Sequence, residues 1–349
     1  MKKHLLVCAA FAALVSGTAA AQAAPPSGAP DPNFKPPRTA WGKPELSGVW
    51  TNSSLTTLQR PPNAATVVIT EDQHARVLAH NQYAMMAKDE AGPSKVDKES
   101  SDKLLGDKNS NRGYNHFWID AGNDYARVGN DIRTAWITTP SDGMIPYIPG
   151  KQPKTTITYD GPEGRPPGER CLTWANLGPV LRNGMYNNNF QFVQTPTHLM
   201  INAEMIHEFR VIPIVASAAD VKHGPTAMKN FGGDSVAYYD GDTLVVETVN
   251  VRQDQRPYIT ATGKVTERFT RWKDNELYYQ FKVEDPSLYA SAWSGDMVLR
   301  SSKEQVYEFA CHEGNYGMHG ILAGARELER QGREHPPEVS IFAGLAADE

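Results

Sequence analysis

Alternating apolar and polar residues dominate the second half of the chain. From Asn187 onward, apolar residues recur at every second position in several long runs, the pattern of a strand with one buried face. Tight turns at 240–242 and 273–275 separate pairs of these runs, and the Asp-Gly pair in the first turn is a strong hairpin signal. The runs predict strands at 190–194, 199–211, 235–239, 243–249, 264–272, 276–283, 297–300 and 305–311.

A meander of this length must protect its two outer strands by closing or by curving strongly. We therefore predict a mainly β fold, an antiparallel meander that forms a barrel or a strongly curved sheet. Thr70, followed by acidic residues, predicts the start of a helix over 70–87. A C-terminal helix over 315–331 has one apolar face. Short strands are expected at 46–50, 116–120 and 134–138.

The first residues have the features of a secretory signal peptide. A basic start at 2–4 precedes an apolar run at 5–15, and small residues allow cleavage after Ala21 or Ala23. The run is shorter than the ~20 residues that a membrane helix needs. We predict a signal peptide over 1–24 and a periplasmic or secreted protein with no transmembrane segment after signal removal. A Pro-rich linker over 25–45, one β-rich domain over 46–335 and a tail over 336–349 would follow.

Charge and cysteine content narrow the function classes. The formal net charge of −5 and the pI near 6.1 exclude a broad basic surface for nucleic acid. Cys171 and Cys311 alone remain after the signal, and in an oxidising compartment they predict one disulfide. Closing so long a loop would contribute roughly 4–5 kcal/mol by the chain-entropy estimate. Two buried thiols, or a nucleophilic cysteine, are the alternatives. The oligomeric state is not determined by these features.

The densest group of reactive side chains follows the last predicted strand. Cys311 is followed within a few positions by His312, Glu313 and Tyr316. In one interpretation His312 is a general acid or base that Glu313 or Tyr316 orients. In the other, Gly314 and the next residue only form a turn and a helix cap, and His312 makes a local hydrogen bond.

Alternation also places charged side chains on inward faces. His207 shares a face of the run 199–211 with apolar residues, and Glu267 shares a face with Val265 and Phe269. A histidine there either has a structural partner or lines an internal cavity as acid or base. We expect His312 and His207 to act as acid and base, with Glu267 or Glu313 as the orienting carboxylate.

Further polar side chains are candidates for ligand binding. Arg268 or Arg210 could stabilise an anion. A hydroxylated or carboxylated ligand could be bound by the amide and guanidinium groups of Asn188, Asn189 and Arg182. Alternatively, these side chains only make hydrogen bonds within loops and at the edge of a strand.

Four segments together resemble a family. They are Glu169-Arg-Cys-Leu172, Tyr186 to Pro196, Gly233-Asp-Ser235 with Gly241 to Thr248, and Cys311 to Tyr316 with Ile321 to Arg326. In this order they resemble a large family of uncharacterised secreted bacterial proteins, over roughly residues 115–330. The resemblance implies one compact secreted domain and assigns no activity. Gly48-Val-Trp50 is similar to the Gly-x-Trp of lipocalin-like barrels, which implies a barrel with a ligand mouth.

Several familiar chemistries have no motif here. The chain lacks a Walker loop, a dinucleotide fingerprint and a Gly-x-Ser-x-Gly elbow, and His312 and His319 do not have zincin spacing. We therefore expect no cofactor and no metal ligands. The sequence favours a cofactor-independent enzyme (lyase, isomerase or hydrolase) that acts by acid–base chemistry on a small hydrophobic, aromatic or glycosidic metabolite. The alternatives are a non-catalytic periplasmic ligand-binding or envelope protein, and a metal-dependent hydrolase.

Overall fold

One large antiparallel sheet forms the body of the molecule. The structure, a computed structural model, describes residues 33–85, 120–152, 162–174, 177–252 and 258–333. Within them a ten-stranded sheet has the order β8-β7-β6-β1-β13-β12-β11-β10-β9, and β5 pairs with β13 beside this path. The strands are β1 Gly48–Thr51, β5 Ile137–Thr139, β6 Asn189–Gln194, β7 His198–Ala203, β8 Phe209–Pro213, β9 Asp234–Asp240, β10 Thr243–Val249, β11 Lys264–Lys273, β12 Glu276–Glu284 and β13 Trp293–Ser301.

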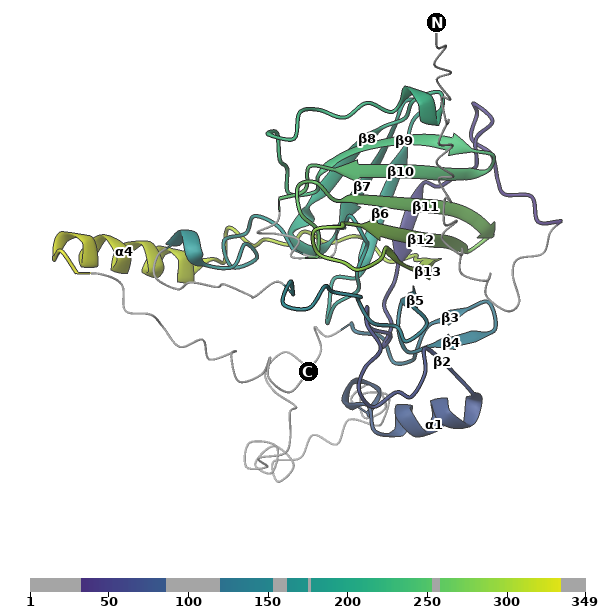
Figure 1. The fold of residues 1–349 in the computed structure, drawn as a ribbon, viewed down its shortest axis with the longest axis horizontal. Helices are drawn as coiled ribbons and strands as arrows, with labels where there is room; N and C mark the ends of the chain where they lie inside the picture. The colour runs from purple at the N-terminus through teal and green to yellow at the C-terminus, as the bar shows by residue number, and fades with distance from the viewer. Residues whose placement is uncertain (1–32, 86–119, 153–161, 175–176, 253–257, 334–349) are drawn as a thin grey trace, which may run out of the picture.

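The sheet curls until its two end strands meet. β8 and β9 approach each other at the top of the barrel (Figure 1), where Ile214, just after β8, forms a bridge with Ala237 of β9. The backbone N–H of Val215 donates to the carbonyl of Ala237 at 2.8 Å. The result is a nearly closed barrel, which confirms the prediction of an antiparallel meander that closes or curves strongly.

Alternation along the strands fills the barrel with apolar side chains. In β12, Leu277 and Tyr279 are fully buried while their neighbours are half exposed. The rings of Phe192 and Phe269 meet edge to face with centroids 5.6 Å apart, and Phe269 also contacts Tyr279. Each fully buried large side chain contributes roughly 1.5–3 kcal/mol. These strand faces agree with the period-2 pattern of the sequence.

A smaller layer lies below the barrel (Figure 1). β2 Val68–Ile69, β3 Arg127–Val128 and β4 Asp131–Arg133 form a three-stranded sheet, and the helix α1 Glu71–Ala79 lies beside it. Thr70 caps α1 through a capping box with Gln73. The helix ends at Ala79 and not at residue 87, because Asn81 accepts hydrogen bonds from the N–H groups of Tyr83 and Ala84 and so caps a new helical turn.

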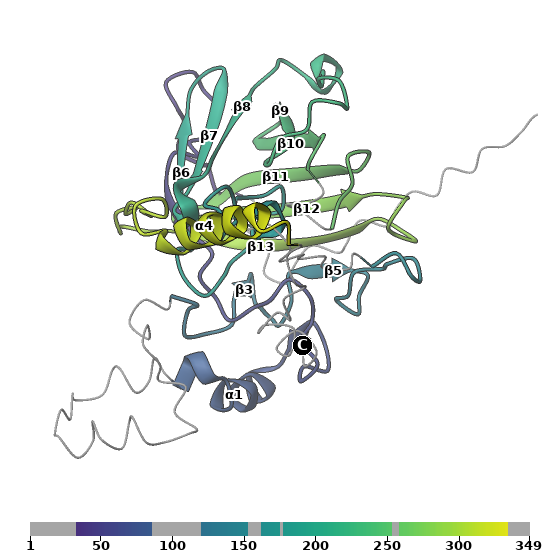
Figure 2. The same ribbon diagram turned by 90° about the vertical axis from the view of Figure 1, so that its left-hand side faces the viewer.

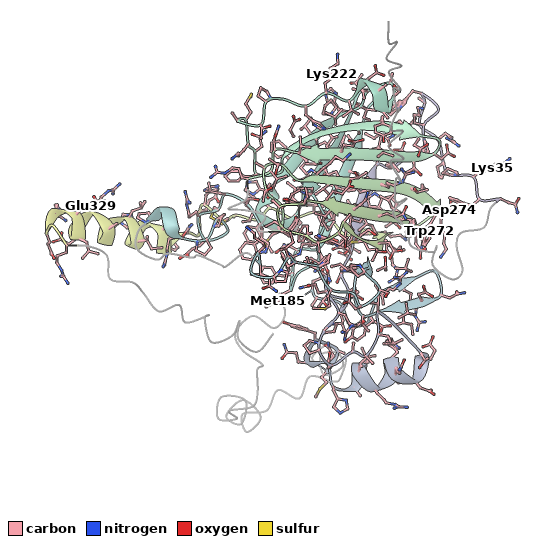
Figure 3. All side chains as sticks on the ribbon, in the orientation of Figure 1. Lys35, Met185, Lys222, Trp272, Asp274 and Glu329 are labelled. Atoms are coloured by element: carbon pink, nitrogen blue, oxygen red, sulfur yellow. A yellow bond between two sulfur atoms is a disulfide. The ribbon has the colours of Figure 1, made fainter. Side chains whose placement is uncertain are left out.

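The C-terminal arm leaves the barrel after β13. The strand predicted at 305–311 is wrong: this segment has no ladder partner and runs as irregular chain to the turn at 311–314. The helix α4 Tyr316–Arg330 then projects away from the sheet (Figures 1 and 2), and Figure 3 shows Glu329 at its far end. β-prone residues at 305–311 could not form a strand without a free edge beside them, because β1 and β12 already pair with β13.

A disulfide fixes the base of this arm. Cys171 and Cys311, 140 positions apart in the sequence, are bonded, so the predicted pairing is confirmed. Asn315 caps α4 by accepting from the N–H of Met318 at 3.0 Å, and its amide donates to the carbonyl of Glu169 at 2.8 Å. The start of α4 and the loop around Cys171 therefore form one unit.

Part of the predicted linker packs against the barrel. Pro36, Thr39 and Pro44 are buried, and Arg38 makes a bidentate pair with Asp242 at 2.7 and 2.6 Å. The part of the predicted linker from Pro36 onward is therefore attached to the barrel. The predicted signal peptide, the tail over 336–349 and residues 116–119 of a predicted strand lie outside the described residues. In the described part of the chain, helices are too short or too polar to cross a bilayer.

The disulfide gives the first testable prediction. Replacing both Cys171 and Cys311 by serine should lower the free energy of unfolding by about 2–5 kcal/mol, because the unfolded chain regains the freedom of a long loop. Urea unfolding measures this. Protease cleavage between residues 302 and 315 should also become faster, and mild reduction of the wild-type protein serves as the matched control. Equal stability and equal cleavage would contradict an anchoring role.

Candidate functional site

The predicted strand over 199–211 is divided in two, and this break determines which of the candidate side chains enter the barrel. The run predicted as one strand over 199–211 is interrupted by the 3-10 turn Met205–His207, in which Ile206 and His207 have left-handed φ values of 57° and 41°. Alternation restarts in the opposite phase after the break. Phe209 is therefore exposed and Arg210 buried. The predicted inward position of His207 is wrong, and its side chain is exposed.

Arg210 enters the barrel and pairs with Glu267. Its Nη2 lies 2.7 Å from Glu267 Oε2, and it also donates to Ser235 Oγ at 3.0 Å and Thr248 Oγ1 at 3.2 Å. Tyr279 donates its hydroxyl proton to Glu267 Oε1 at 2.8 Å. The alternation pattern placed Glu267 correctly on the inward face of β11, and the break brings Arg210 to it.

Electrostatics keep this network charged. Burial by itself would lower the pKa of Arg210, but the adjacent carboxylate of Glu267 outweighs that effect and raises the pKa. Burial, and then the negative charge of Glu267, raise the pKa of the Tyr279 hydroxyl well above its usual value. The tyrosine is therefore a neutral hydroxyl that donates to Glu267 beside the ion pair.

The segment 177–181 covers the ion pair. A Cβ atom on Gly178 would lie 2.7 Å from Arg210 Nη1, so the backbone passes directly against the guanidinium group. The N–H of Leu181 donates to the Tyr279 hydroxyl at 3.0 Å, and Tyr258 donates to the carbonyl of Pro179. Arg210, predicted to stabilise an anion, and Glu267, predicted to orient a histidine, thus bind each other inside a covered core.

The other predicted residues lie apart from this network. Arg268 is on the outer face of β11 and pairs with Asp240 at 2.9 Å. The amide of Asn188 is buried and donates to the carbonyl of Asp120 at 2.6 Å, and Asn189 donates to Glu204 Oε2 at 2.9 Å. These two asparagines hold backbone and loop positions.

His312, Glu313 and Tyr316 lie at the exposed base of the arm. All three side chains are exposed, Tyr316 by 84%. Asn315 forms the helix cap between them, as the plainer interpretation of this segment expects. The predicted cluster of His312 with His207 inside a barrel cavity is wrong, because neither side chain enters the barrel. Arg182 lines a different cavity.

An open groove lies between the break and the disulfide. It has a volume of ≈ 320 Å³, and His207 and Glu208 line it from the break. The opposite walls come from the disulfide loop and from the loop that leads into β9. The other lining residues are Cys171, Leu172, Ile206, Phe209, Phe231 and Gly232.

Strained backbone is concentrated around this groove. Cys171, Ile206 and His207 all line it, and all have positive φ values, of 54°, 57° and 41°. Such conformations cost roughly 1–3 kcal/mol each in non-glycine residues, most of all in β-branched ones such as Ile206. Strain of this kind is typical of functional sites, where the surrounding structure holds a side chain in a required position.

The imidazole of His207 is fixed by the arm. Its Nδ1 lies 3.0 Å from the backbone carbonyl oxygen of Phe309. A carbonyl oxygen can only accept, so Nδ1 must carry the proton. In the neutral ring the lone pair is then on Nε2. His207 therefore lines the groove as an imidazole with a defined tautomer and a basic second nitrogen.

Glu208 ties the two walls of the groove together. Its carboxylate accepts hydrogen bonds from the buried hydroxyl of Thr173 and from the N–H of Trp174, the latter at 3.3 Å. The loop that follows Cys171 is thus attached to the break both by this carboxylate and through the arm.

Sequence reasoning missed most of this groove. Leu172, Phe209 and Phe231 were not candidates, because the groove depends on the break and not on alternation. The one available signal was the polar pair His207-Glu208 inside an apolar run.

Comparison with family models and with curated proteins gives no match for this chain. The described residues contain no group of three or more His, Cys, Asp or Glu side chains placed to hold a metal ion. The family resemblance of the four segments stays a prediction.

The buried ion pair gives the second testable prediction. Glu267→Gln should lower the free energy of unfolding by about 3–5 kcal/mol, because it leaves Arg210 charged and uncompensated in the core. Replacing both partners, Arg210→Met with Glu267→Leu, should cost less than the single change. Arg268→Gln, on the outer face of the same strand, is the matched control and should stay within about 0.5 kcal/mol. A small effect of Glu267→Gln in urea unfolding would contradict this prediction.

Proposed function

We propose that the groove is the active site of a cofactor-independent periplasmic or secreted enzyme, in which His207 acts as general base on a small hydrophobic or aromatic metabolite. The observation that carries the proposal is the hydrogen bond from His207 Nδ1 to the carbonyl of Phe309. It leaves the basic nitrogen Nε2 on an imidazole that lines an open groove. A backbone carbonyl is one of the usual partners that set the tautomer of a working histidine.

The chemistry needs only proton movements. Nε2 of His207 takes a proton from an acidic C–H bond of the substrate, or from a water molecule that attacks it. The positive charge of the resulting imidazolium strengthens the hydrogen bond from Nδ1–H to Phe309. In an isomerisation the ring then returns the proton to another carbon of the substrate. In an elimination or a hydrolysis it gives the proton to the leaving group as the bond between that group and the substrate breaks. A positioned base of this kind contributes about 10²–10⁴-fold to the rate.

The walls of the groove favour an apolar substrate. Leu172 and Phe209 are 37% and 62% exposed, and Phe231 lines the groove beside them. Apolar side chains left in contact with water gain free energy when a ligand covers them. An aromatic ring can also stack on a phenylalanine face.

A non-catalytic ligand-binding protein is the second candidate. The observation that favours it is a row of apolar side chains across the outer face of β6, β7 and β8, where Val193 and Val211 are exposed on either side of Met200. Exposed apolar patches of this kind are typical of binding surfaces.

Activity of a His207 variant tests the proposal. Purified protein is incubated with a panel of small aromatic and terpenoid esters, lactones and enolisable ketones, and substrate loss is followed by mass spectrometry. For a compound that is turned over, kcat/KM of His207→Gln should fall about 10²–10⁴-fold, because the base is removed. His198→Gln, an exposed histidine on β7, is the matched control and should keep full activity. Undiminished turnover by His207→Gln would exclude His207 as the base. Binding without turnover of any compound would favour the second candidate.

The tautomer of His207 can be tested without a substrate. A long-range ¹H–¹⁵N spectrum of the protein at a pH where the ring is neutral should show the proton on Nδ1, because Phe309 offers only an acceptor. Loss of the signal in His207→Gln assigns it. In protein with both Cys171 and Cys311 replaced by serine, the preference for Nδ1–H should weaken. A proton found on Nε2 of the wild-type ring would contradict the proposed base.

A further inference from the structure

A second cavity lies where the barrel meets the small sheet. It has a volume of ≈ 290 Å³ and shares no lining residue with the His207 groove. Apolar walls come from the segment after β1, the turn after α1, the chain before β3, the residue before β5 and the loop before β6. They include Leu55, Leu58, Tyr83, Ala121, Trp136 and Met185. Figure 3 shows Met185 at the lower edge of the barrel, above the small sheet.

The side chain of Asn183 connects the walls of the cavity through three hydrogen bonds. Asn183 donates to the carbonyls of Ser54 and Thr56 at 2.7 and 2.9 Å, and its Oδ1 accepts from Trp136 Nε1 at 2.9 Å. One side chain thus joins three walls of the same cavity. A binding site built this way is preformed, so a ligand does not lose affinity in ordering it.

Further hydrogen bonds attach the wall segments of this cavity to the barrel. The N–H of Trp136 donates to the carbonyl of Thr57 at 2.9 Å, and the N–H of Gly184 donates to Asn188 Oδ1 at 2.7 Å. Trp136 and Asn188 are both fully buried. The two wall segments are therefore attached to the core.

One charged side chain lines this apolar cavity. Among the described lining residues Arg182 alone carries a charge, and it is half-buried. A guanidinium group offers several N–H donors in one plane, so it can receive a carboxylate in addition to the contacts it already makes. A volume near 300 Å³ is at the small end of ligand sites in proteins.

We propose that this cavity binds a small carboxylate with an apolar or aromatic body, the carboxylate on Arg182 and the body against Leu58 and Met185. The site is independent of the proposed active site, so either proposal can fail while the other stands.

Benzoate and benzamide are suitable probes because they have nearly the same shape and differ in charge. Titration calorimetry of the full wild-type protein with sodium benzoate should show saturable binding at millimolar concentrations or below. Benzamide should bind at least about tenfold more weakly, because the contact with Arg182 loses its charge. Absence of benzoate binding, or equal binding of the two probes, would overturn the proposal.

Variants locate the site. Arg182→Gln should weaken benzoate about tenfold and leave benzamide unchanged, whereas Arg76→Gln, an exposed arginine on α1, should change neither. If Arg182→Gln does not fold, Ala121→Leu serves instead, because a larger side chain there fills the cavity and should abolish binding of both probes. His207→Gln should bind benzoate as the wild type does. Benzoate binding that survives both cavity variants would place the ligand elsewhere and overturn the proposal.

Discussion

The ion pair between Arg210 and Glu267 closes a barrel whose backbone ladder is incomplete at one seam. Between β8 and β9 the described chain has a single bridge, at Ile214 and Ala237. Arg210 reaches from β8 across this seam to Ser235 of β9, Thr248 of β10 and Glu267 of β11. A side-chain network thus does what a ladder of backbone hydrogen bonds does between the other strands. Its members are buried, so the closure depends on both charges being present.

The break at 204–208 couples this closure to the groove. By inserting two left-handed residues it reverses the phase of β8, which turns Arg210 inward and leaves His207 and Phe209 outside. A continuous strand would have placed Arg210 in solvent, with no partner for Glu267. The same few residues therefore turn Arg210 into the core and form one wall of the groove.

Features set by local periodicity could be predicted from sequence. The β9–β10 and β11–β12 hairpins, the inward face of Glu267 and the caps at Thr70 and Asn315 follow from neighbouring residues alone. The break at 205–207 could not be predicted from neighbouring residues, because Met205 and Ile206 are apolar like the strand residues before them. Nor could the arm: residues 305–311 have strand-forming types, but whether a strand forms depends on a free edge elsewhere in the sheet. The groove could not be predicted either, because the break forms one of its walls and the arm holds His207 in place.

The disulfide limits the position of the carbonyl group to which the His207 imidazole is hydrogen-bonded. Phe309, whose carbonyl holds His207, lies two residues before Cys311, so the bond to Cys171 limits where that carbonyl can move. Without the disulfide this limit on the carbonyl of Phe309 is absent, whereas the Arg210–Glu267 ion pair that closes the barrel does not involve either cysteine. The disulfide therefore bears on the position of the His207 ring more directly than on the closure of the barrel.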